Sequence, residues 1–119
     1  MHSIVLNMEF NIENWKSQIR KGYLELCILL LIKEKKKLYG FELLEVLEKQ
    51  NFQIKEGTLY PLLNRMGADD LLASIWDTSG VSSGHPRKFY SITKKGEKAL
   101  KEMSEEFNKL TEVYNSLSK

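Results

Sequence analysis

The chain contains a single cysteine and only two histidines among its 119 residues. One thiol cannot form an internal disulfide, and Cys27 lies inside the apolar run LCILLLI. We therefore expect a buried side chain in a protein of a reducing compartment, the cytoplasm. His2 and His85 are far apart in sequence and lack further ligands nearby, so we predict no metal site.

Long hydrophobic runs are absent as well. The run LCILLLI is far shorter than the roughly 20 residues that a bilayer span requires, and Glu25 and Lys33 bracket it. It predicts a buried helix and no contact with a membrane. The net charge is only +2, so a nucleic-acid surface would have to come from local clusters of cations.

Signatures of catalysis are missing too. The sequence has no nucleophile paired with a base, no phosphate-binding glycine loop and no cluster of carboxylates set in a pocket motif. We predict no catalytic residues and no cofactor.

The most informative stretch is KEGTLYPLLNR, from Lys55 to Arg65. As a helix it directs an apolar stripe toward a core, and this stripe contains Leu59, Leu62, Leu63 and Met66. The opposite face carries small or polar groups that can approach a partner closely, namely Gly57, Tyr60, Pro61, Asn64 and Arg65. Such a face, poor in acids and with Lys55 at its start, suits a DNA groove and predicts a recognition helix.

Two helices are predicted before this stretch. The first begins after Asn11 or Asn14, either of which can cap it, and continues to about Lys33. The second covers 39–50 and has leucines on one side and glutamates on the other. A short turn over 51–54 leads into the recognition helix, which completes a helix-turn-helix. The acidic side of the second helix should not lie on DNA.

A strand pattern follows the recognition helix. Residues 71–79 place apolar groups on both faces, which predicts a strand partly buried on each, with Trp76 in the core. The Gly- and Ser-rich segment 79–86 is typical of a loop, and 87–93 predict a second strand. The two strands form a hairpin with basic residues at its tip, which are His85, Arg87 and Lys88. A basic hairpin beside a helix-turn-helix is a wing.

A last helix is predicted from Thr93, which can cap it, to about Leu117. Its apolar residues recur at alternating spacings of three and four, the repeat of a coiled-coil seam. They are Leu100, Met103, Phe107, Leu110, Tyr114 and Leu117. About 25 residues at roughly 1.5 Å each form a rod of about 37 Å. This rod is longer than a small core can cover, so we expect it to pair with a second copy of the chain.

The predicted fold class is therefore α+β and mostly helical. It is a winged helix-turn-helix with a long C-terminal dimerisation helix. We assign 1–92 to the DNA-binding domain, including an N-terminal arm over 1–10, and 93–119 to the dimerisation helix.

Several separated motifs resemble the PadR-like transcriptional regulators, and the likeness covers nearly the whole chain. In order they are RKGYLELCILLLI, LYGFELLEVL, GTLYPLLNRM, LLASIWDTS, SGHPRKFYSIT and KKG. The resemblance implies a homodimeric, cytoplasmic winged-helix repressor that binds inverted-repeat operators. It also implies a response to a hydrophobic or aromatic small molecule and control of efflux or detoxification genes. The single helix after the wing resembles the shorter subgroup of the family.

The resemblance assigns residues by position. Gly57, Thr58, Tyr60 and Asn64 match the recognition helix, and Arg87 and Lys88 match the basic wing. In some relatives the position of Phe107 holds an aromatic residue that lines a drug pocket between subunits.

Two residues depart from the family pattern. Asp70 stands where glycine is common after the recognition helix, which makes this junction a candidate for a different geometry. His85 occupies a wing position that is often glycine or proline. This difference bears on how the wing docks on DNA and not on the fold.

The candidate DNA-binding residues divide into two roles. Asn64 and Arg65 are candidates for sequence readout, because Asn pairs bidentately with adenine and Arg with guanine. Lys55, Arg87 and Lys88 are expected to hold phosphate or reach the minor groove, which positions the protein without reading sequence.

Two questions stay open at the level of sequence. Four aromatic residues on the first and last helices either line a ligand site or simply pack the dimer. These are Trp15, Tyr23, Phe107 and Tyr114. The second question is the class of function, because a winged helix can also serve as a protein-binding adaptor that no longer binds DNA. The basic wing argues against the adaptor.

Overall fold

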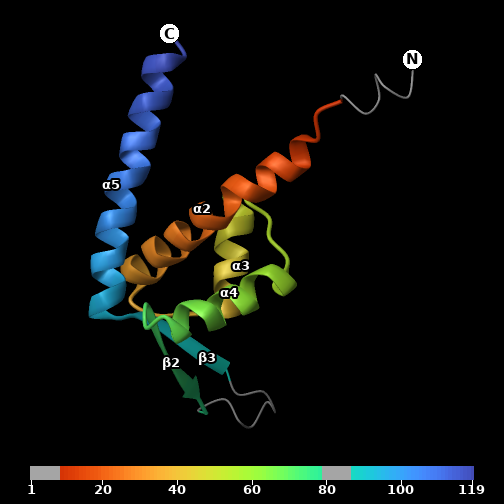
Figure 1. Ribbon diagram of the computed structural model, residues 1–119. Coiled ribbons are helices and arrows are strands. Elements are labelled where there is room, and N and C mark those ends of the chain that lie inside the picture. The colour runs from red at the N-terminus through yellow and green to blue at the C-terminus, as the bar shows by residue number, and fades with distance from the viewer. Residues whose placement is uncertain (1–8, 79–86) are drawn as a thin grey trace.

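The computed structural model describes residues 9–78 and 87–119, so most of the predicted arm and His85 of the wing tip lie outside the described residues. Figure 1 shows the arrangement of the elements. In chain order they are α2 (Ile12–Lys35), β1 (Leu38–Tyr39), α3 (Gly40–Lys49), α4 (Glu56–Ala68), β2 (Leu72–Asp77), β3 (Arg87–Ile92) and α5 (Lys94–Leu117). The predicted α+β class, mostly helical, is confirmed.

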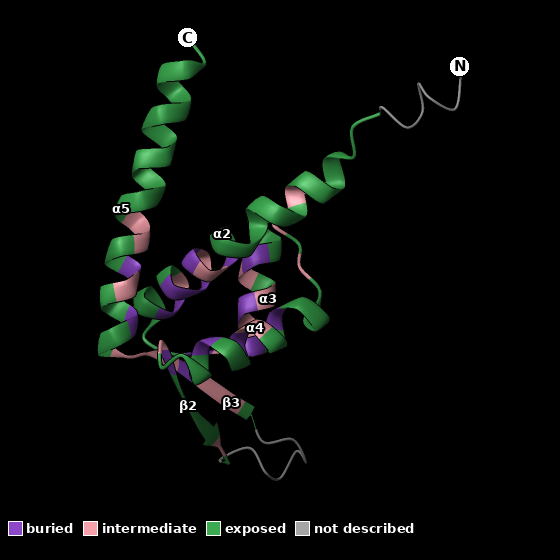
Figure 2. Cartoon of the chain, in the orientation of Figure 1, coloured by how far each residue is buried: buried purple, intermediate pink, exposed green. Residues whose placement is uncertain are grey.

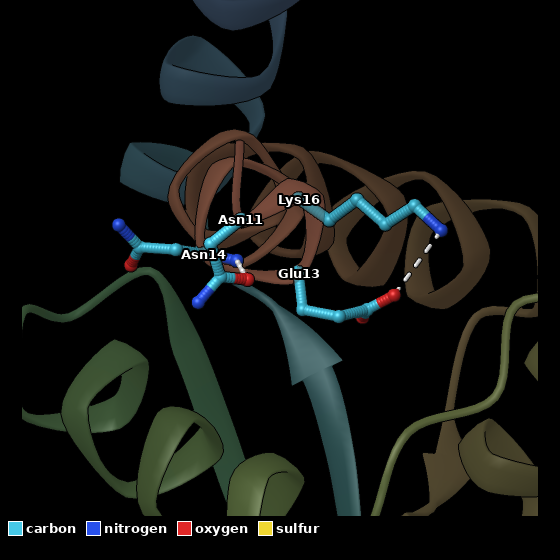
Figure 3. Close-up of polar contacts among 4 residues, drawn as sticks. All are labelled: Asn11, Glu13, Asn14 and Lys16. Carbon is cyan, nitrogen blue, oxygen red and sulfur yellow. Dashed lines mark hydrogen bonds and ion pairs between the residues drawn. The ribbon is translucent and has the colours of Figure 1, made fainter. Parts of the chain in front are cut away.

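Both long helices begin at side-chain caps. The Asn14 N–H donates to Oδ1 of Asn11 at 3.2 Å, so Asn11 is the residue that caps α2 (Figure 3). An ion pair between Lys16 and Glu13, at 3.5 Å, lies on the same turn. At α5 the predicted cap is confirmed, because the Gly96 N–H donates to Oγ1 of Thr93 at 2.9 Å.

The helices of the helix-turn-helix end in the same way. The residue after each C-cap is left-handed, with φ of 60° at Asn51 and 61° at Asp70. After α4 the Leu71 N–H donates to the Met66 carbonyl at 2.9 Å and the Asp70 N–H to the Gly67 carbonyl at 3.0 Å. These two bonds are those of a Schellman motif. Asp70 therefore takes the conformation that glycine favours, and the junction keeps its standard geometry.

One hydrophobic core holds the helices and the sheet together (Figure 2). The predicted stripe of the recognition helix is confirmed, since Leu59, Leu63 and Met66 are fully buried and Leu62 is half-buried. The largest other side chains with no exposure are Ile28, Leu29, Ile32 and Leu43. Burial of this apolar surface fixes α4 by its inner face and leaves its outer face to solvent.

The wing contains a strand that the sequence did not predict. The sheet has three antiparallel strands in the order β1-β3-β2, with Leu38 opposite Tyr90 and Tyr39 opposite Phe89. Two residues are too short for an alternating pattern, so β1 could not be recognised from sequence. Helix α3 consequently begins at Gly40, and Oε1 of Glu42 accepts from the Tyr39 N–H at 2.8 Å.

The expected burial of β2 on both faces is wrong. Only Leu72 at the start of the strand is buried, whereas Ile75 is 69% exposed and Trp76, expected in the core, is 59% exposed. Figure 1 shows β2 and β3 extending away from the helices. The side chains of Ile75 and Trp76 therefore remain largely in contact with water.

The C-terminal helix packs on the body only near its beginning. Leu100 is buried in the core of its own chain and Met103 is half-buried, so Leu100 does not belong to an exposed dimerisation stripe. Farther along, α5 and the N-terminal half of α2 diverge (Figure 1). Among the residues that the structure describes, no helix is long and apolar enough to span a membrane.

Candidate nucleic-acid interface

The outer face of α4 presents most of the predicted DNA-binding residues. Gly57, Thr58, Tyr60 and Asn64 are exposed on the helix, and Lys55 occupies its N-cap position. A Cβ built on Gly57 would meet no atom within 4 Å. Packing within the chain therefore does not require glycine here, and its absent side chain leaves room for a partner to approach the backbone.

Tyr60 has a structural contact that the sequence did not reveal. Its ring covers Gly40 at the start of α3, so that a Cβ on Gly40 would lie 2.6 Å from Cε1 of Tyr60. The side chain is nevertheless 37% exposed. Tyr60 thus fixes α4 against α3 and still offers part of its ring to a partner.

The Arg65 side chain also makes a contact within the protein. Its guanidinium forms an ion pair with the carboxylate of Glu25 on α2. The Arg65 side chain is 59% exposed, whereas that of Glu25 is only 18% exposed. Sequence spacing gave no signal for this pair, because its members belong to different helices.

Each of the two wing cations, Arg87 and Lys88, lies over an aromatic ring. Residues that follow one another in a strand point to opposite sides, and the register pairs Trp76 with Lys88 and Asp77 with Arg87. The Lys88 ammonium lies 5.6 Å from the ring centroid of Trp76, and the Arg87 guanidinium lies 4.9 Å from that of Tyr39. Both distances fall within the range of cation–π attraction.

The Tyr39 phenol ties β1 to β2. Its hydroxyl donates to Oδ2 of Asp77 at 2.7 Å. This hydrogen bond raises the pKa of Tyr39, and desolvation and the negative charge of Asp77 raise it further. On the other side of the sheet, burial raises the pKa of Tyr90, with a smaller contribution from Tyr60.

A groove of about 810 Å³ lies between α3, α4 and the wing. It brings the predicted helix residues Tyr60 and Asn64 together with the predicted wing residues Arg87 and Lys88. Lys55, Gly57, Thr58 and Arg65 lie outside its lining. The wing side of the groove is cationic, and the α3 side is acidic because it carries Glu42 and Glu45.

The groove also contains aromatic residues that sequence reasoning missed. Trp76 and Phe41, each 59% exposed, line it together with Tyr39. Trp76 lies opposite Lys88 in the register of the two strands, which could have indicated a place beside the basic wing. The expectation that this strand is buried led instead to a place in the core.

A second groove lies between α2 and α5 and has a volume of about 730 Å³. All four aromatic residues proposed as ligand-lining or dimer-packing line it, namely Trp15, Tyr23, Phe107 and Tyr114. The ring centroids of Tyr23 and Phe107 are 5.4 Å apart, and the ring of Phe52 stacks on that of Tyr23 at 5.6 Å. Sequence reasoning did not include Phe52.

Cys27 borders this aromatic cluster and is partly buried. Burial raises the pKa of its thiol, and a hydrogen bond with Tyr23 opposes this effect. A raised pKa keeps the thiol protonated and weakly nucleophilic, as expected for a packing residue.

Comparison with known proteins identifies the chain. Residues 28–102 match the Transcriptional regulator PadR-like family. The chain belongs to the PadR-like family of transcriptional regulators. It is a DNA-binding protein that regulates transcription, and it is not an enzyme.

Known relatives support this membership over most of the chain. A PadR-like transcription factor from Bacteroides fragilis is 43% identical, with a TM-score of 0.74 over 87% of this chain and 98% of that one. A PadR-like regulator from Bacillus cereus is 38% identical, with a TM-score of 0.74 over 86% and 97% of the two chains. A transcriptional regulator of Mycobacterium tuberculosis is 38% identical over 54% of this chain and 57% of its own.

The matched span indicates which part of this PadR-like regulator the family describes best. Residues 28–102 contain the helix-turn-helix and the wing. They exclude the four aromatic residues of the α2–α5 groove. The family match therefore concerns the DNA-binding part most directly.

Proposed function

We propose that this PadR-like regulator binds an inverted repeat in duplex DNA as a homodimer, with α4 in the major groove and the wing on the flanking backbone. The observation that supports the proposal is the groove that Tyr60, Asn64, Arg87 and Lys88 line together. A recognition helix and a cationic wing that share one concave surface can contact base edges and phosphates of the same DNA segment.

Each residue has a distinct role in this proposal. Asn64 reads a base edge, because its amide offers both N–H donors and an acceptor oxygen. Lys55, Arg87 and Lys88 hold phosphates or reach the minor groove. Gly57 and Thr58 allow close approach of the α4 backbone to the DNA.

The dimer is proposed from the exposed apolar surface of α5. Exposure of its predicted seam rises along the helix, from 41% at Phe107 and 57% at Leu110 to 80% at Leu117. A contiguous apolar surface of this kind is unfavourable in water and marks an interaction site. We assign 93–119 to dimerisation and 1–92 to DNA binding. Two copies would present their recognition helices about one DNA turn apart, roughly 34 to 36 Å.

A ligand response is the second candidate, and the α2–α5 groove favours it. A flat hydrophobic molecule would stack on Tyr23 and Phe107, change the angle between the subunits and relieve repression of efflux or detoxification genes in the cytoplasm. Its effect is limited by its difference in affinity for the two states. Plain packing of a partner subunit on the same rings is the competing use of the groove.

The experiment is fluorescence anisotropy with a labelled duplex from the region upstream of the gene. Binding at low salt, with affinity that falls as salt rises and with preference over a scrambled duplex, is the expected result. A protein that retains neither duplex at low salt would fit the adaptor instead. Addition of planar cationic dyes or phenolic acids, followed by tryptophan fluorescence and release of DNA, tests the ligand response.

A further inference from the structure

The ion pair between Arg65 and Glu25 joins the recognition helix to α2. Arg65 lies in the last turn of α4, and Glu25 lies in the middle of α2. The guanidinium of Arg65 is thus directed to its own chain, although it belongs to the exposed side of the helix that sequence spacing assigned to DNA.

The two partners differ in their access to solvent. The Glu25 side chain is 18% exposed and that of Arg65 is 59% exposed. A carboxylate with so little access to water depends on its partner, because an unpaired, partly buried charge is costly. Moving Arg65 onto DNA would leave the Glu25 carboxylate unpaired near a polyanion.

We propose that Arg65 is a positioning residue, which fixes the orientation of α4 relative to α2. Its ion pair with Glu25 keeps its charge away from the DNA. This inference rests on the proposed binding of DNA by α4 and changes the role of one residue in it. Sequence readout then falls to Asn64, while Arg65 sets the angle at which Asn64 meets the base pairs.

The place of Glu25 on α2 gives the pair a second consequence. Tyr23 and Leu26, its near neighbours in sequence, line the aromatic groove between α2 and α5. One turn of α2 therefore contacts the groove on one side and the recognition helix on the other.

The test is the salt dependence of DNA binding, which counts phosphate contacts and does not respond to a loss of folding stability as such. The variants are Arg65→Gln, Glu25→Gln and the double variant E25Q/R65Q, with Arg87→Gln as the matched control on the wing. Circular dichroism monitors folding. The double variant removes both charges together, so it keeps the test valid if Arg65→Gln alone unfolds the chain.

The proposal predicts that R65Q and E25Q/R65Q keep the slope of log K against log salt found for the wild type. R87Q should flatten this slope by about one unit per protomer. E25Q should steepen it by a similar amount, because the freed guanidinium can reach the backbone. The inference would be overturned if the slope for R65Q or for the double variant were as flat as the slope for R87Q. It would also be overturned if the slope for E25Q equalled that of the wild type. Failure of the wild type to bind any duplex would instead overturn the proposed function and this inference with it.

Discussion

Gly40 lies beneath the ring of Tyr60, and a Cβ at this position would come within 2.6 Å of Cε1 and 3.0 Å of the hydroxyl oxygen. The contact joins the first residue of α3 to the exposed side of α4. The two helices of the helix-turn-helix, α3 and α4, therefore pack closely at Gly40, because glycine leaves room for the Tyr60 ring.

Substitution of Gly40 should disturb DNA binding from within the protein. In Gly40→Ala the Tyr60 ring must move, which turns its side chain in the DNA-facing groove. Because the atoms in the way are the far end of a side chain that is 37% exposed, the loss of stability should stay below about 1 kcal/mol. Fluorescence anisotropy and urea unfolding measure the two effects. Gly57→Ala is the matched control, because a Cβ there meets no atom of the chain within 4 Å. It should keep the stability and lose DNA affinity, and wild-type affinity in G57A would show that this side of α4 does not meet DNA.

Gly96 should be far less tolerant of substitution. A Cβ there would lie 2.1 Å from the carbonyl oxygen of Leu71 and 2.8 Å from Cγ1 of Ile92. The first of these atoms is backbone and cannot rotate away, so Gly96→Ala should lose more than about 3 kcal/mol in urea unfolding. Gly22→Ala, in an open position on α2, should be neutral or stabilise by up to about 1 kcal/mol. Equal stability of the two variants would contradict the close packing of α5 on the turn after α4.

The Tyr39–Asp77 hydrogen bond predicts a pH effect at the alkaline end. The folded-state pKa of Tyr39 is raised, chiefly by this bond. The protonated phenol therefore contributes its full stabilisation below the unfolded pKa of about 10, and this contribution is lost as the pH rises through the higher folded-state pKa.

Asp77→Asn removes the carboxylate charge and should bring the pKa of Tyr39 down toward its ordinary value. The measurement is an ultraviolet titration of phenolate absorbance, with Tyr39→Phe subtracted to isolate this group. An unchanged titration curve in D77N would contradict the assigned cause.

Much of the DNA-binding unit could be predicted from sequence because its signals are local. The stripe of Leu59, Leu63 and Met66 follows from helical periodicity. The cap at Thr93, and the choice between Asn11 and Asn14 at the first helix, follow from hydrogen-bonding chemistry within one turn. These features depend only on residues a few positions apart.

The features that sequence missed depend on contacts between distant segments. Strand β1 exists because Leu38 finds Tyr90 on β3, and Arg65 turns to Glu25 on another helix. The exposure of Trp76 follows from how far the wing extends beyond the helices. None of these contacts produces a periodic pattern of residues that could be recognised in the sequence.

Two residues of the DNA-facing groove should respond differently to substitution. Lys88→Ala should weaken binding to all duplexes and flatten the salt slope by about one unit per protomer, as expected for a phosphate contact. Asn64→Ala should mainly reduce discrimination between the operator and a mismatched duplex, by about 1–3 kcal/mol. Competition binding at several salt concentrations measures both effects. If the two variants behaved alike, the division between positioning and readout would be wrong.

The central claim is that two copies, paired through α5 and α2, present two recognition helices to one duplex. Sedimentation equilibrium of the protein alone and with an operator-length duplex at low ionic strength tests this claim most directly. We expect a dimer in the absence of DNA and two chains on each duplex in its presence. A stable monomer, or a protein that sediments without the duplex, would contradict the account.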